Sequence, residues 1–401
     1  MRTIYAETSI PRFLATRALA RWWPGVRTSA LGVARYAERP DPPLPTPRHV
    51  RVRNRVALIC GSDMHWVVGD GDPRIGPAAL PSQQKVYLGH ELCGEIIEAG
   101  AEVQELAVGD RVALRAPYPT CETLGIAPAC RQCAAGEYVL CENQGLGAEP
   151  PAIGGGWSDT WVAHASQLFR PPAALSDEQV ALLEPSAVGV RAALQALPAP
   201  AEKVLVLGCG STGLMIIQAL HALAPEAEII AMARYSFQAE MAARLGAQHV
   251  FVRGDGYQIA AQQTGATVYR GRMGSAMVLG GYDVVYDAVG SGRTLTDALR
   301  WARARGRVVL TGVAMKPLTV DLSSLWFQAL TLSGFVWHGQ EQWGGESLST
   351  FDLAARLMAA RAMDPTTLIT HRYPLDRWRE ALRVASDRRT HGAIKVAFDM
   401  R

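Results

Sequence analysis

The fold of this chain can be read from the segment Lys203-Val-Leu-Val-Leu-Gly-Cys-Gly-Ser-Thr-Gly213. Its apolar beginning predicts a buried strand, and the residues that follow predict a helix over 212–224. The three glycines between them have the G-x-G-x-x-G spacing of a turn that holds a dinucleotide pyrophosphate. They permit a tight turn, close approach of a phosphate and close packing of helix on strand, while free helix N–H groups face the phosphates. The residues predicted to bind a cofactor in this turn are Gly208, Gly210, Ser211, Thr212 and Gly213.

Strand and helix patterns alternate on both sides of this turn, which predicts a doubly wound parallel sheet of the Rossmann type over residues 185–339. A capping box at Ser176-Asp-Glu-Gln179 marks the change from the preceding region. The strands expected here are residues 203–207, 228–233, 283–287, 307–311 and 331–337, and the further helices are residues 238–245 and 294–304.

The rest of the chain has a different pattern. Short strands broken by glycines are expected at residues 50–58, 94–99 and 111–115, and a last strand at 393–398. We therefore expect a mostly-β, barrel-like domain built from residues 1–184 and 340–401. Residues 1–47 are expected to be irregular apart from a helical piece around residues 12–20, and 1–49 form an N-terminal extension.

Composition excludes several classes of protein. The formal net charge of the 401 residues is only +3, which does not favour a nucleic-acid partner. Residues 1–60 hold eleven Arg against three acids; we interpret this as a solvated surface, with a transit peptide as the alternative. The chain has no apolar run long enough for a membrane helix or a signal peptide. Seven cysteines, four of them clustered, favour a reducing compartment, and we expect a cytoplasmic protein.

The clustered cysteines have the spacing of a metal site. Four thiolates within one loop suit a closed tetrahedral zinc site that stabilises the loop rather than doing chemistry. The predicted ligands of this structural zinc are Cys121, Cys130, Cys133 and Cys141.

The end of the second strand of the cofactor domain bears on the choice between NAD and NADP. An acid there binds the ribose 2′-hydroxyl of NAD, whereas an Arg accommodates the 2′-phosphate of NADP. Here the strand ends in Arg234-Tyr235 and the acid is absent. We therefore predict NADP(H), with Arg234 and Tyr235 at the cofactor. The alternative is that Arg234 is an ordinary surface residue and the protein uses NAD.

Three further motifs complete a recognisable set: Cys60-Gly-Ser-Asp-Met-His65, Gly89-His90-Glu91 and Leu183-Glu184-Pro185. In this order, with the cysteine loop and the glycine turn, they resemble the zinc-dependent medium-chain dehydrogenase/reductase family. These motifs are most similar to those of its sorbitol and threonine dehydrogenase branch. The resemblance covers roughly residues 50–401, and it implies a GroES-like catalytic domain beside the Rossmann domain. Residues 1–49 and 262–279 match less well and look like additions.

The resemblance implies a catalytic zinc bound by Cys60, His90 and Glu184, with an open position for water or substrate. In this branch Glu91 can replace the more distant glutamate, so both remain candidates. The alternative for Cys60 and His90 is that they are ordinary core residues.

The same motifs imply supporting roles. Asp63 would accept the second ring N–H of His90, Ser62 would hydrogen-bond the substrate oxygen, and His65 would pass its proton to bulk water. Asp63 as a turn residue and His65 as an exposed loop residue are the alternatives.

The cysteine loop departs from the family spacing of Cys-x2-Cys-x2-Cys-x7-Cys. Residues 122–129 separate Cys121 from Cys130, so the sequence leaves open whether Cys121 completes the site.

The substrate pocket is the least specified part. Trp66, Trp157, Trp337 and His338 are candidates, with core or subunit contacts as the alternative. The polyol branch places an Arg and a Tyr at the positions of Trp337 and His338, so we expect a substrate more aromatic or apolar than sorbitol.

Together these features predict a zinc-dependent oxidoreductase that transfers a hydride between NADP(H) and an alcohol or polyol or the corresponding aldehyde or ketone. The resemblance also implies a homodimer or homotetramer. The alternatives are a non-catalytic cofactor-binding protein and a zinc-independent quinone or enoyl reductase on the same fold.

Overall fold

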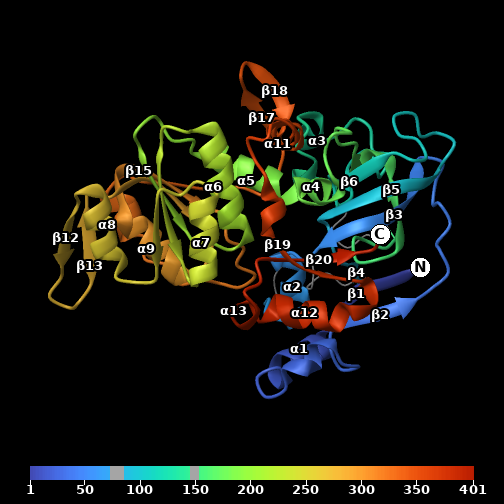
Figure 1. Ribbon diagram of the computed structural model, residues 1–401, viewed down its shortest axis with the longest axis horizontal. Helices are drawn as coiled ribbons and strands as arrows, with labels where there is room; N and C mark the ends of the chain where they lie inside the picture. Colours follow the sequence, from blue (N-terminus) through green and yellow to red (C-terminus); the bar gives the residue numbers. More distant parts are fainter. Residues whose placement is uncertain (73–84, 145–152) are drawn as a thin grey trace. The chain divides into compact units, whose positions relative to one another are not determined.

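The computed structural model describes residues 1–72, 85–144 and 153–401 (Figure 1). The chain divides into two units, which we call unit 1 and unit 2. Unit 1 consists of Met1–Glu184, His338–Ala359 and Pro365–Arg401, and unit 2 consists of Pro185–Trp337 and Ala360–Asp364. Unit 2 therefore interrupts unit 1 in the sequence.

Unit 2 contains a six-stranded sheet of order β11-β10-β9-β14-β15-β16, in which every pairing is parallel. The predicted Rossmann-type sheet is confirmed. Apolar residues such as Val204 and Leu205 on β9 are buried on both faces, as expected of a parallel sheet covered by helices. The strands are β9 (Lys203–Leu207), β10 (Glu228–Ala233), β11 (His249–Val252), β14 (Tyr282–Asp287), β15 (Ala302–Leu310) and β16 (Thr331–Gly334).

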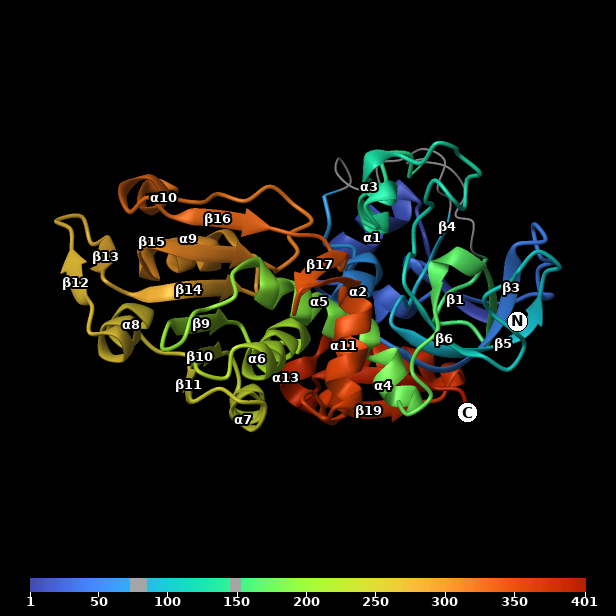
Figure 2. The same ribbon diagram turned by 90° about the horizontal axis from the view of Figure 1, so that it is seen from above.

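Helices cover both faces of this sheet, with α6 and α7 on one side and α8 and α9 on the other (Figures 1 and 2). Helix α9 ends at Trp301 and not at residue 304, because Ala302 is already extended and pairs with Tyr282 in the sheet. Likewise β16 ends at Gly334 and not at residue 337. The helices of this region are α5 (Leu183–Gln195), α6 (Ser211–Leu223), α7 (Ser236–Arg244), α8 (Gly256–Thr264), α9 (Gly292–Trp301) and α10 (Ser323–Phe327).

The segment 262–279 holds a small antiparallel hairpin of β12 (Thr267–Arg270) and β13 (Ala276–Leu279). It packs against α8 and α9.

Unit 1 is mostly β, as predicted. Its largest sheet has the order β19-β20-β3-β5-β6-β8, and β7 pairs with β3. The late strand β20 lies between β19 and the early strand β3, so segments far apart in the sequence share one sheet. The strands are β3 (His49–Leu58), β5 (Leu92–Ala99), β6 (Arg111–Leu114), β7 (Thr160–His164), β8 (Leu168–Phe169), β19 (Ile369–Tyr373) and β20 (Lys395–Asp399).

Apart from the N-terminal elements described below, unit 1 also contains short helices and one hairpin. They are α2 (Gly61–Val68), α3 (Arg131–Ala134), η3 (Tyr138–Leu140), η4 (Ala165–Gln167), α4 (Asp177–Ala181), β17 (Gln340–Trp343), β18 (Glu346–Ser349), α11 (Thr350–Ala359), η5 (Pro365–Leu368), η6 (Leu375–Arg377), α12 (Trp378–Ser386) and α13 (Arg388–His391). Among the described residues, no helix has the length and apolar character needed to cross a membrane.

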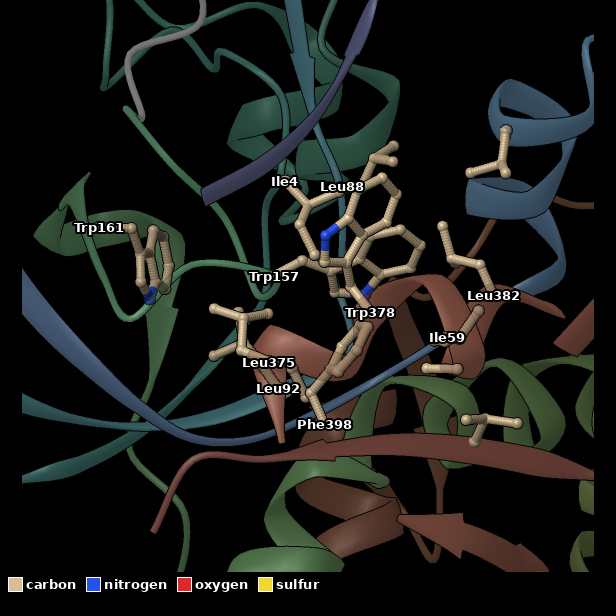
Figure 3. Close-up of a cluster of buried hydrophobic side chains, with 14 of the residues drawn as sticks. Ile4, Ile59, Leu88, Leu92, Trp157, Trp161, Leu375, Trp378, Leu382 and Phe398 are labelled. Carbon is tan, nitrogen blue, oxygen red and sulfur yellow. The ribbon is translucent and has the colours of Figure 1, made fainter. Parts of the chain in front are cut away.

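The core of unit 1 is centred on Trp157, which is fully buried (Figure 3). Its ring meets the Phe398 ring edge-on at 5.5 Å between centroids, and its Nε1 donates to the carbonyl of Leu58 at 3.1 Å. Trp157 was a candidate for the substrate pocket, and this is corrected: it has no exposed surface and fills the core. The indole ring packs against other core side chains and its N–H has a hydrogen-bond acceptor, so the whole side chain is accounted for by the core.

The expectation that residues 1–47 are irregular is wrong. Strands β1 (Arg2–Glu7), β2 (Ala34–Glu38) and β4 (Lys85–Tyr87) form an antiparallel sheet of order β2-β1-β4. The expected helical piece is present as α1 (Ile10–Leu19), followed by the 3-10 helix η1 (Pro24–Thr28). The N–H of Ile4 donates to the carbonyl of Trp157 at 2.8 Å, so the N-terminal strand is joined to the core.

We expect Ile4→Ala to lower the free energy of unfolding by about 2–5 kcal/mol, because it deletes a fully buried side chain. Ile10→Ala is the matched control, since Ile10 is 53% exposed and should change stability by less than about 0.5 kcal/mol. Urea denaturation of both variants measures the difference. Equal losses would contradict an N-terminal segment that is integral to the core.

Candidate metal and cofactor sites

Three predicted metal ligands lie together in unit 1. One ligand atom from each of Cys60, His90 and Glu91 lies within 4.8 Å of the other two. Cys60 is the N-cap residue of α2, while His90 and Glu91 directly precede β5. A thiolate, an imidazole and a carboxylate at this separation fit a zinc ion, which accepts all three as ligands.

Asp63 holds the two ligand-bearing segments together. It is 3% exposed, and its carboxylate accepts the N–H of Cys60 and the N–H of Gly89, each at 3.0 Å. Its Oδ1 lies 3.6 Å from Nδ1 of His90, at ion-pair rather than hydrogen-bond distance. Asp63 therefore fixes the backbone on both sides of the cluster and orients His90 chiefly by charge.

The charges around His90 favour its protonated form in the absence of a metal. Burial opposes protonation, but the negative charges of Asp63 and Cys60 outweigh it and raise the pKa of His90 well above its usual value. Metal binding at this cluster would therefore release a proton from His90.

Glu184, named first in the sequence analysis, lies outside the group formed by Cys60, His90 and Glu91. It stands at the start of α5 and is 5% exposed. Burial raises the pKa of its carboxyl to about 7. Within the described residues, this carboxylate has no hydrogen-bond or ion-pair partner.

Glu91, by contrast, already has a partner. Both of its carboxylate oxygens receive hydrogen bonds from Nζ of Lys395 on β20, and both side chains are 1% exposed. Sequence reasoning missed Lys395. Its position in the apolar stretch Ala393–Phe398, in a chain that holds only four lysines, could have indicated a buried lysine with an acidic partner. A buried ammonium needs a charge partner, and here it takes one of the two candidate glutamates.

The other residues of the α2 motif face different surroundings. Ser62 Oγ lies 3.5 Å from Nε2 of His90, at the edge of the cluster. His65 is half-buried, and its Nδ1 lies 2.7 Å from Oδ1 of the more exposed Asp70. Trp66, one turn later than Ser62, is partly buried against the unit 1 core.

The remaining pocket candidates belong to different units. Trp337 is the last residue of the first segment of unit 2 and takes a φ of 47°. His338 opens the second segment of unit 1, is 5% exposed, and meets the Phe351 ring edge-on at 4.6 Å.

The four-cysteine loop closes on itself. The sulfur atoms of Cys121, Cys130, Cys133 and Cys141 all lie within 4.8 Å of one another. The long insert at residues 122–129 therefore brings Cys121 round to the other three.

Backbone N–H groups surround these sulfur atoms. The N–H of Cys133 donates to Sγ of Cys130 at 3.4 Å, and the N–H of Asn143 donates to Sγ of Cys141 at 3.4 Å. Hydrogen bonds from the Cys133 and Glu142 backbone lower the pKa of Cys130 to about 6. Four sulfur atoms at this separation, with N–H donors to Cys130 and Cys141, fit a tetrahedral zinc site.

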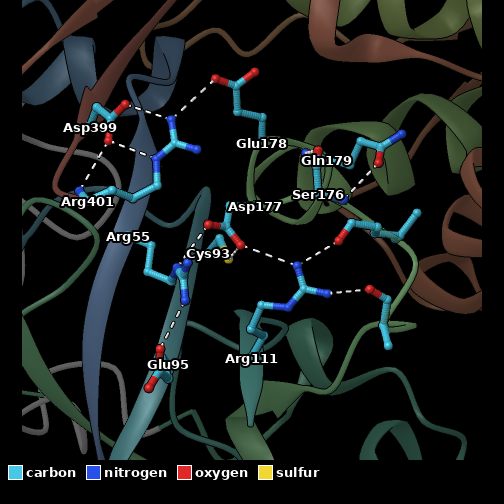
Figure 4. Close-up of polar contacts among 12 residues, drawn as sticks. Arg55, Cys93, Glu95, Arg111, Ser176, Asp177, Glu178, Gln179, Asp399 and Arg401 are labelled. Carbon is cyan, nitrogen blue, oxygen red and sulfur yellow. Dashed lines mark hydrogen bonds and ion pairs between the residues drawn. The ribbon is translucent and has the colours of Figure 1, made fainter. Parts of the chain in front are cut away.

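A network of ion pairs anchors the segment that leads to Glu184 (Figure 4). Asp177, at the start of α4, pairs with Arg55 of β3 at 2.9 Å and with Arg111 of β6 at 3.2 Å. Arg55 also pairs with Glu95 of β5 at 3.0 Å. Ion pairs from three strands of the unit 1 sheet thus anchor α4. Glu184 follows Asp177 by seven residues and so lies just beyond this anchored helix.

The glycine turn of unit 2 has the geometry that its spacing predicts. Gly208 has a φ of 97°, and a Cβ on Gly213 would lie 1.9 Å from the carbonyl oxygen of Gly208. A Cβ on Gly210 would meet nothing within 4 Å, so the backbone there is open to an approaching group. Helix α6 begins at Ser211, followed by Thr212, and directs its free N–H groups to this opening. The turn fits a pyrophosphate.

Arg234 and Tyr235 follow β10, as expected. The Arg234 side chain is exposed, and its guanidinium lies 5.4 Å from the centre of the Tyr235 ring. Nε of Arg253, after β11, donates to the carbonyl of Arg234 at 3.3 Å. Two arginines therefore lie where the second strand of the cofactor sheet ends.

We expect Asp177→Asn to lower the free energy of unfolding by about 1–3 kcal/mol, because it removes the charge that two partly buried arginines share. Glu102→Gln is the matched control. Its ion pair with Arg48 is 56–59% exposed and contributes at most about 1 kcal/mol. Chemical denaturation measures both, and a loss no larger than that of Glu102→Gln would contradict an anchoring role for Asp177.

Comparisons with known proteins show the family to which the chain is related. Residues 46–173 match the family described as "Alcohol dehydrogenase GroES-like domain", and residues 211–351 match "Zinc-binding dehydrogenase". The chain is 30% identical to an L-idonate 5-dehydrogenase of Vitis vinifera, covering 95% of this chain and 94% of that one. It is 30% identical to a sorbitol dehydrogenase of Arabidopsis thaliana, covering 88% and 89%.

The fold is also similar to that of solved structures. A protein of Sinorhizobium meliloti 1021, described as a zinc-binding dehydrogenase and bound to NADP, aligns with a TM-score of 0.68 at 25% identity. The alignment covers 99% of each chain.

Proposed function

This chain belongs to the zinc-dependent medium-chain dehydrogenase/reductase family, in its sorbitol and threonine dehydrogenase branch, and we propose that it transfers a hydride between NADP(H) and a polyol or related alcohol. The observation that carries this proposal is the convergence of Cys60 and His90 beside buried carboxylates. We assign the metal chemistry to unit 1 and cofactor binding to unit 2.

When bound, zinc supplies a Lewis acid that favours loss of the proton from a substrate hydroxyl, and the nicotinamide accepts the hydride. Ser62 would bind the substrate oxygen, because its hydroxyl lies beside Nε2 of His90. His65 would carry the released proton outward. Its half-buried ring and its contact with the more exposed Asp70 support a path to solvent.

We propose that Glu184, rather than Glu91, completes the catalytic ligand set with Cys60 and His90. Glu91 lies closer, but its carboxylate is already neutralised by Lys395. Glu184 is buried without a partner among the described residues, and burial raises its carboxyl pKa to about 7. A cation would relieve the cost of ionising it. Glu91 remains the alternative ligand.

The substrate pocket and the assembly are also proposals. Trp66, Trp337 and His338 remain candidates for contact with the substrate. The unpaired edge of β16 and the neighbouring exposed side chains of Trp326 and Phe327 (83% and 59% exposed) support a homodimer or homotetramer. The seven cysteines form no disulfide in this chain, which supports the cytoplasmic location that we propose.

We expect two zinc ions per chain in the wild-type protein and one in Cys60→Ala, because the variant removes a ligand of the catalytic site only. Cys209→Ala is the matched control, since Cys209 is buried outside both clusters and should retain both ions. Elemental analysis of protein purified without chelators gives the numbers. One zinc in the wild-type protein and the same one zinc in Cys60→Ala would leave only the structural site and favour a zinc-independent reductase. No zinc in the wild-type protein would revive the non-catalytic alternative.

We propose NADP(H) as the cofactor because Arg234 is free to meet a 2′-phosphate. Arg234→Gln should weaken NADPH binding by roughly 10- to 100-fold and leave NADH binding nearly unchanged, since a charge-assisted hydrogen bond is lost only with the former. Arg272→Gln, an exposed arginine in the hairpin of unit 2, is the control for total charge. Fluorescence titration with both nucleotides measures the ratio. A parallel loss for NADPH and NADH would contradict recognition of the 2′-phosphate by Arg234.

A further inference from the structure

Unit 1 contains a groove to which the proposed reaction assigns no role. It is a groove of about 780 Å³ between the 3-10 helix η1 and helix α12. Its lining includes Val67, on the last turn of α2, and α2 packs against η1. In Figure 1 the labelled helices α1, α2 and α12 lie in the same part of unit 1. The groove therefore lies between the N-terminal extension and two helices of the catalytic unit.

Three arginines line this groove: Arg27, Arg379 and Arg383. Nε of Arg379 donates to the carbonyl of Thr28 at 3.3 Å, and Nη1 of Arg383 lies 3.0 Å from Nε2 of His391. Nε of Arg27 is buried and has no hydrogen-bond partner. Across residues 1–72, 85–144 and 153–401, no carboxylate lies within ion-pair distance of any of the three.

Two carboxylates in the same lining are engaged elsewhere. Glu380 pairs with Arg377, three residues before it on the chain. Asp387 accepts the N–H of Thr390 at 3.3 Å and so caps α13. Asp387 also interacts electrostatically with Arg383. Among the described residues, none of the three guanidinium groups forms an ion pair, so the groove keeps an excess of positive charge.

The rest of the lining is apolar. Pro24, Val67 and Leu382 form part of it, and its exposed surface is more apolar than polar. Its volume falls within the range of about 300–1,000 Å³ that is typical of small-molecule sites, which combine an apolar lining with a few polar groups. An inorganic anion would use the arginines and leave this apolar surface uncovered.

We propose that this groove binds a small organic anion. Its carboxylate or phosphate would meet Arg27, Arg379 and Arg383, since guanidinium groups bind both kinds of oxyanion in bidentate geometry. Its apolar part would cover Pro24, Val67 and Leu382. The ligand would join the N-terminal extension to α12 and to α2, the helix that carries Ser62, Asp63 and His65.

Isothermal titration of the full-length, zinc-loaded protein tests this proposal with four probes. Octanoate and octyl phosphate carry an apolar chain with either head group, while acetate and inorganic phosphate carry the head group alone. We expect one site per chain for octanoate or octyl phosphate, and binding of the short probes that is weaker by about tenfold or more. The tighter of the two long probes identifies the head group. Inorganic phosphate that binds as tightly as octyl phosphate would overturn the organic part of the proposal.

The location of the site is tested by substitution. Arg27→Gln/Arg383→Gln should weaken binding of the long probes by about tenfold or more, because two charge-assisted contacts are lost. Arg17→Gln, on α1 and outside the groove, is the control and should bind normally. Arg27→Gln alone removes no internal hydrogen bond of Nε and should weaken binding without lowering the melting temperature.

Unchanged binding in the double variant would overturn the proposal, because it would place the anion elsewhere, for instance at the catalytic metal. Absence of binding to the wild-type protein would overturn it as well. Since the titration measures no dehydrogenase activity, its outcome is independent of the reaction proposed above.

Discussion

The buried carboxylate of Asp63 is the contact on which the catalytic region depends. It accepts N–H groups from Cys60 and from Gly89, two segments that are 29 residues apart in the sequence. This bridge ties the N-terminus of α2 to the residue before His90, and so helps to hold the thiolate and the imidazole at ligand distance. The same carboxylate also biases the charge state of His90. One side chain therefore sets both the geometry and the electrostatics of the metal ligands.

Charge compensation then distinguishes the two candidate glutamates, of which the sequence analysis named Glu184 first and Glu91 second. Glu91 and Glu184 are both buried and both stand near His90. Among the described residues Glu91 forms an ion pair with Lys395 and Glu184 forms none, although Lys395 and His90 also favour its charged form electrostatically. In a medium of low polarity, an unpaired carboxylate either takes up a proton or attracts a cation. This contrast is the physical basis for our proposal that Glu184 is the zinc ligand, although Glu91 lies in the geometric group with Cys60 and His90. It also explains why a lysine lies next to the buried apolar residues of β20.

Short sequence patterns predicted the features that depend on residues close together in the chain. The glycine turn at 208–213 and the strand–helix alternation after it follow from short-range sterics and periodicity, and the Rossmann sheet was predictable from them. Strand β1 was not, because its four buried residues Thr3–Ala6 acquire their partners from β2, β4 and the segment at Trp157, all distant in the sequence. Trp157 was misplaced for the same reason, since nothing nearby in the sequence indicates that Phe398 closes its pocket. The four cysteines could be predicted as a group from their spacing. Whether residues 122–129 bring Cys121 to the other three depends on the path of that segment in the folded chain.

The order of the strands in unit 1 has a consequence for how the protein is made. Strand β20 pairs with β3, and it delivers Lys395 to Glu91 some three hundred residues after that glutamate has been synthesised. On the ribosome, the early strands of unit 1 and the Rossmann sheet of unit 2 are synthesised before β20. The Rossmann unit can fold while unit 1 still lacks a central strand and the countercharge of its metal region. The ion pair of Glu91 can therefore form only after β20 has been synthesised, and until then the nascent chain must keep an incomplete sheet from pairing with other chains.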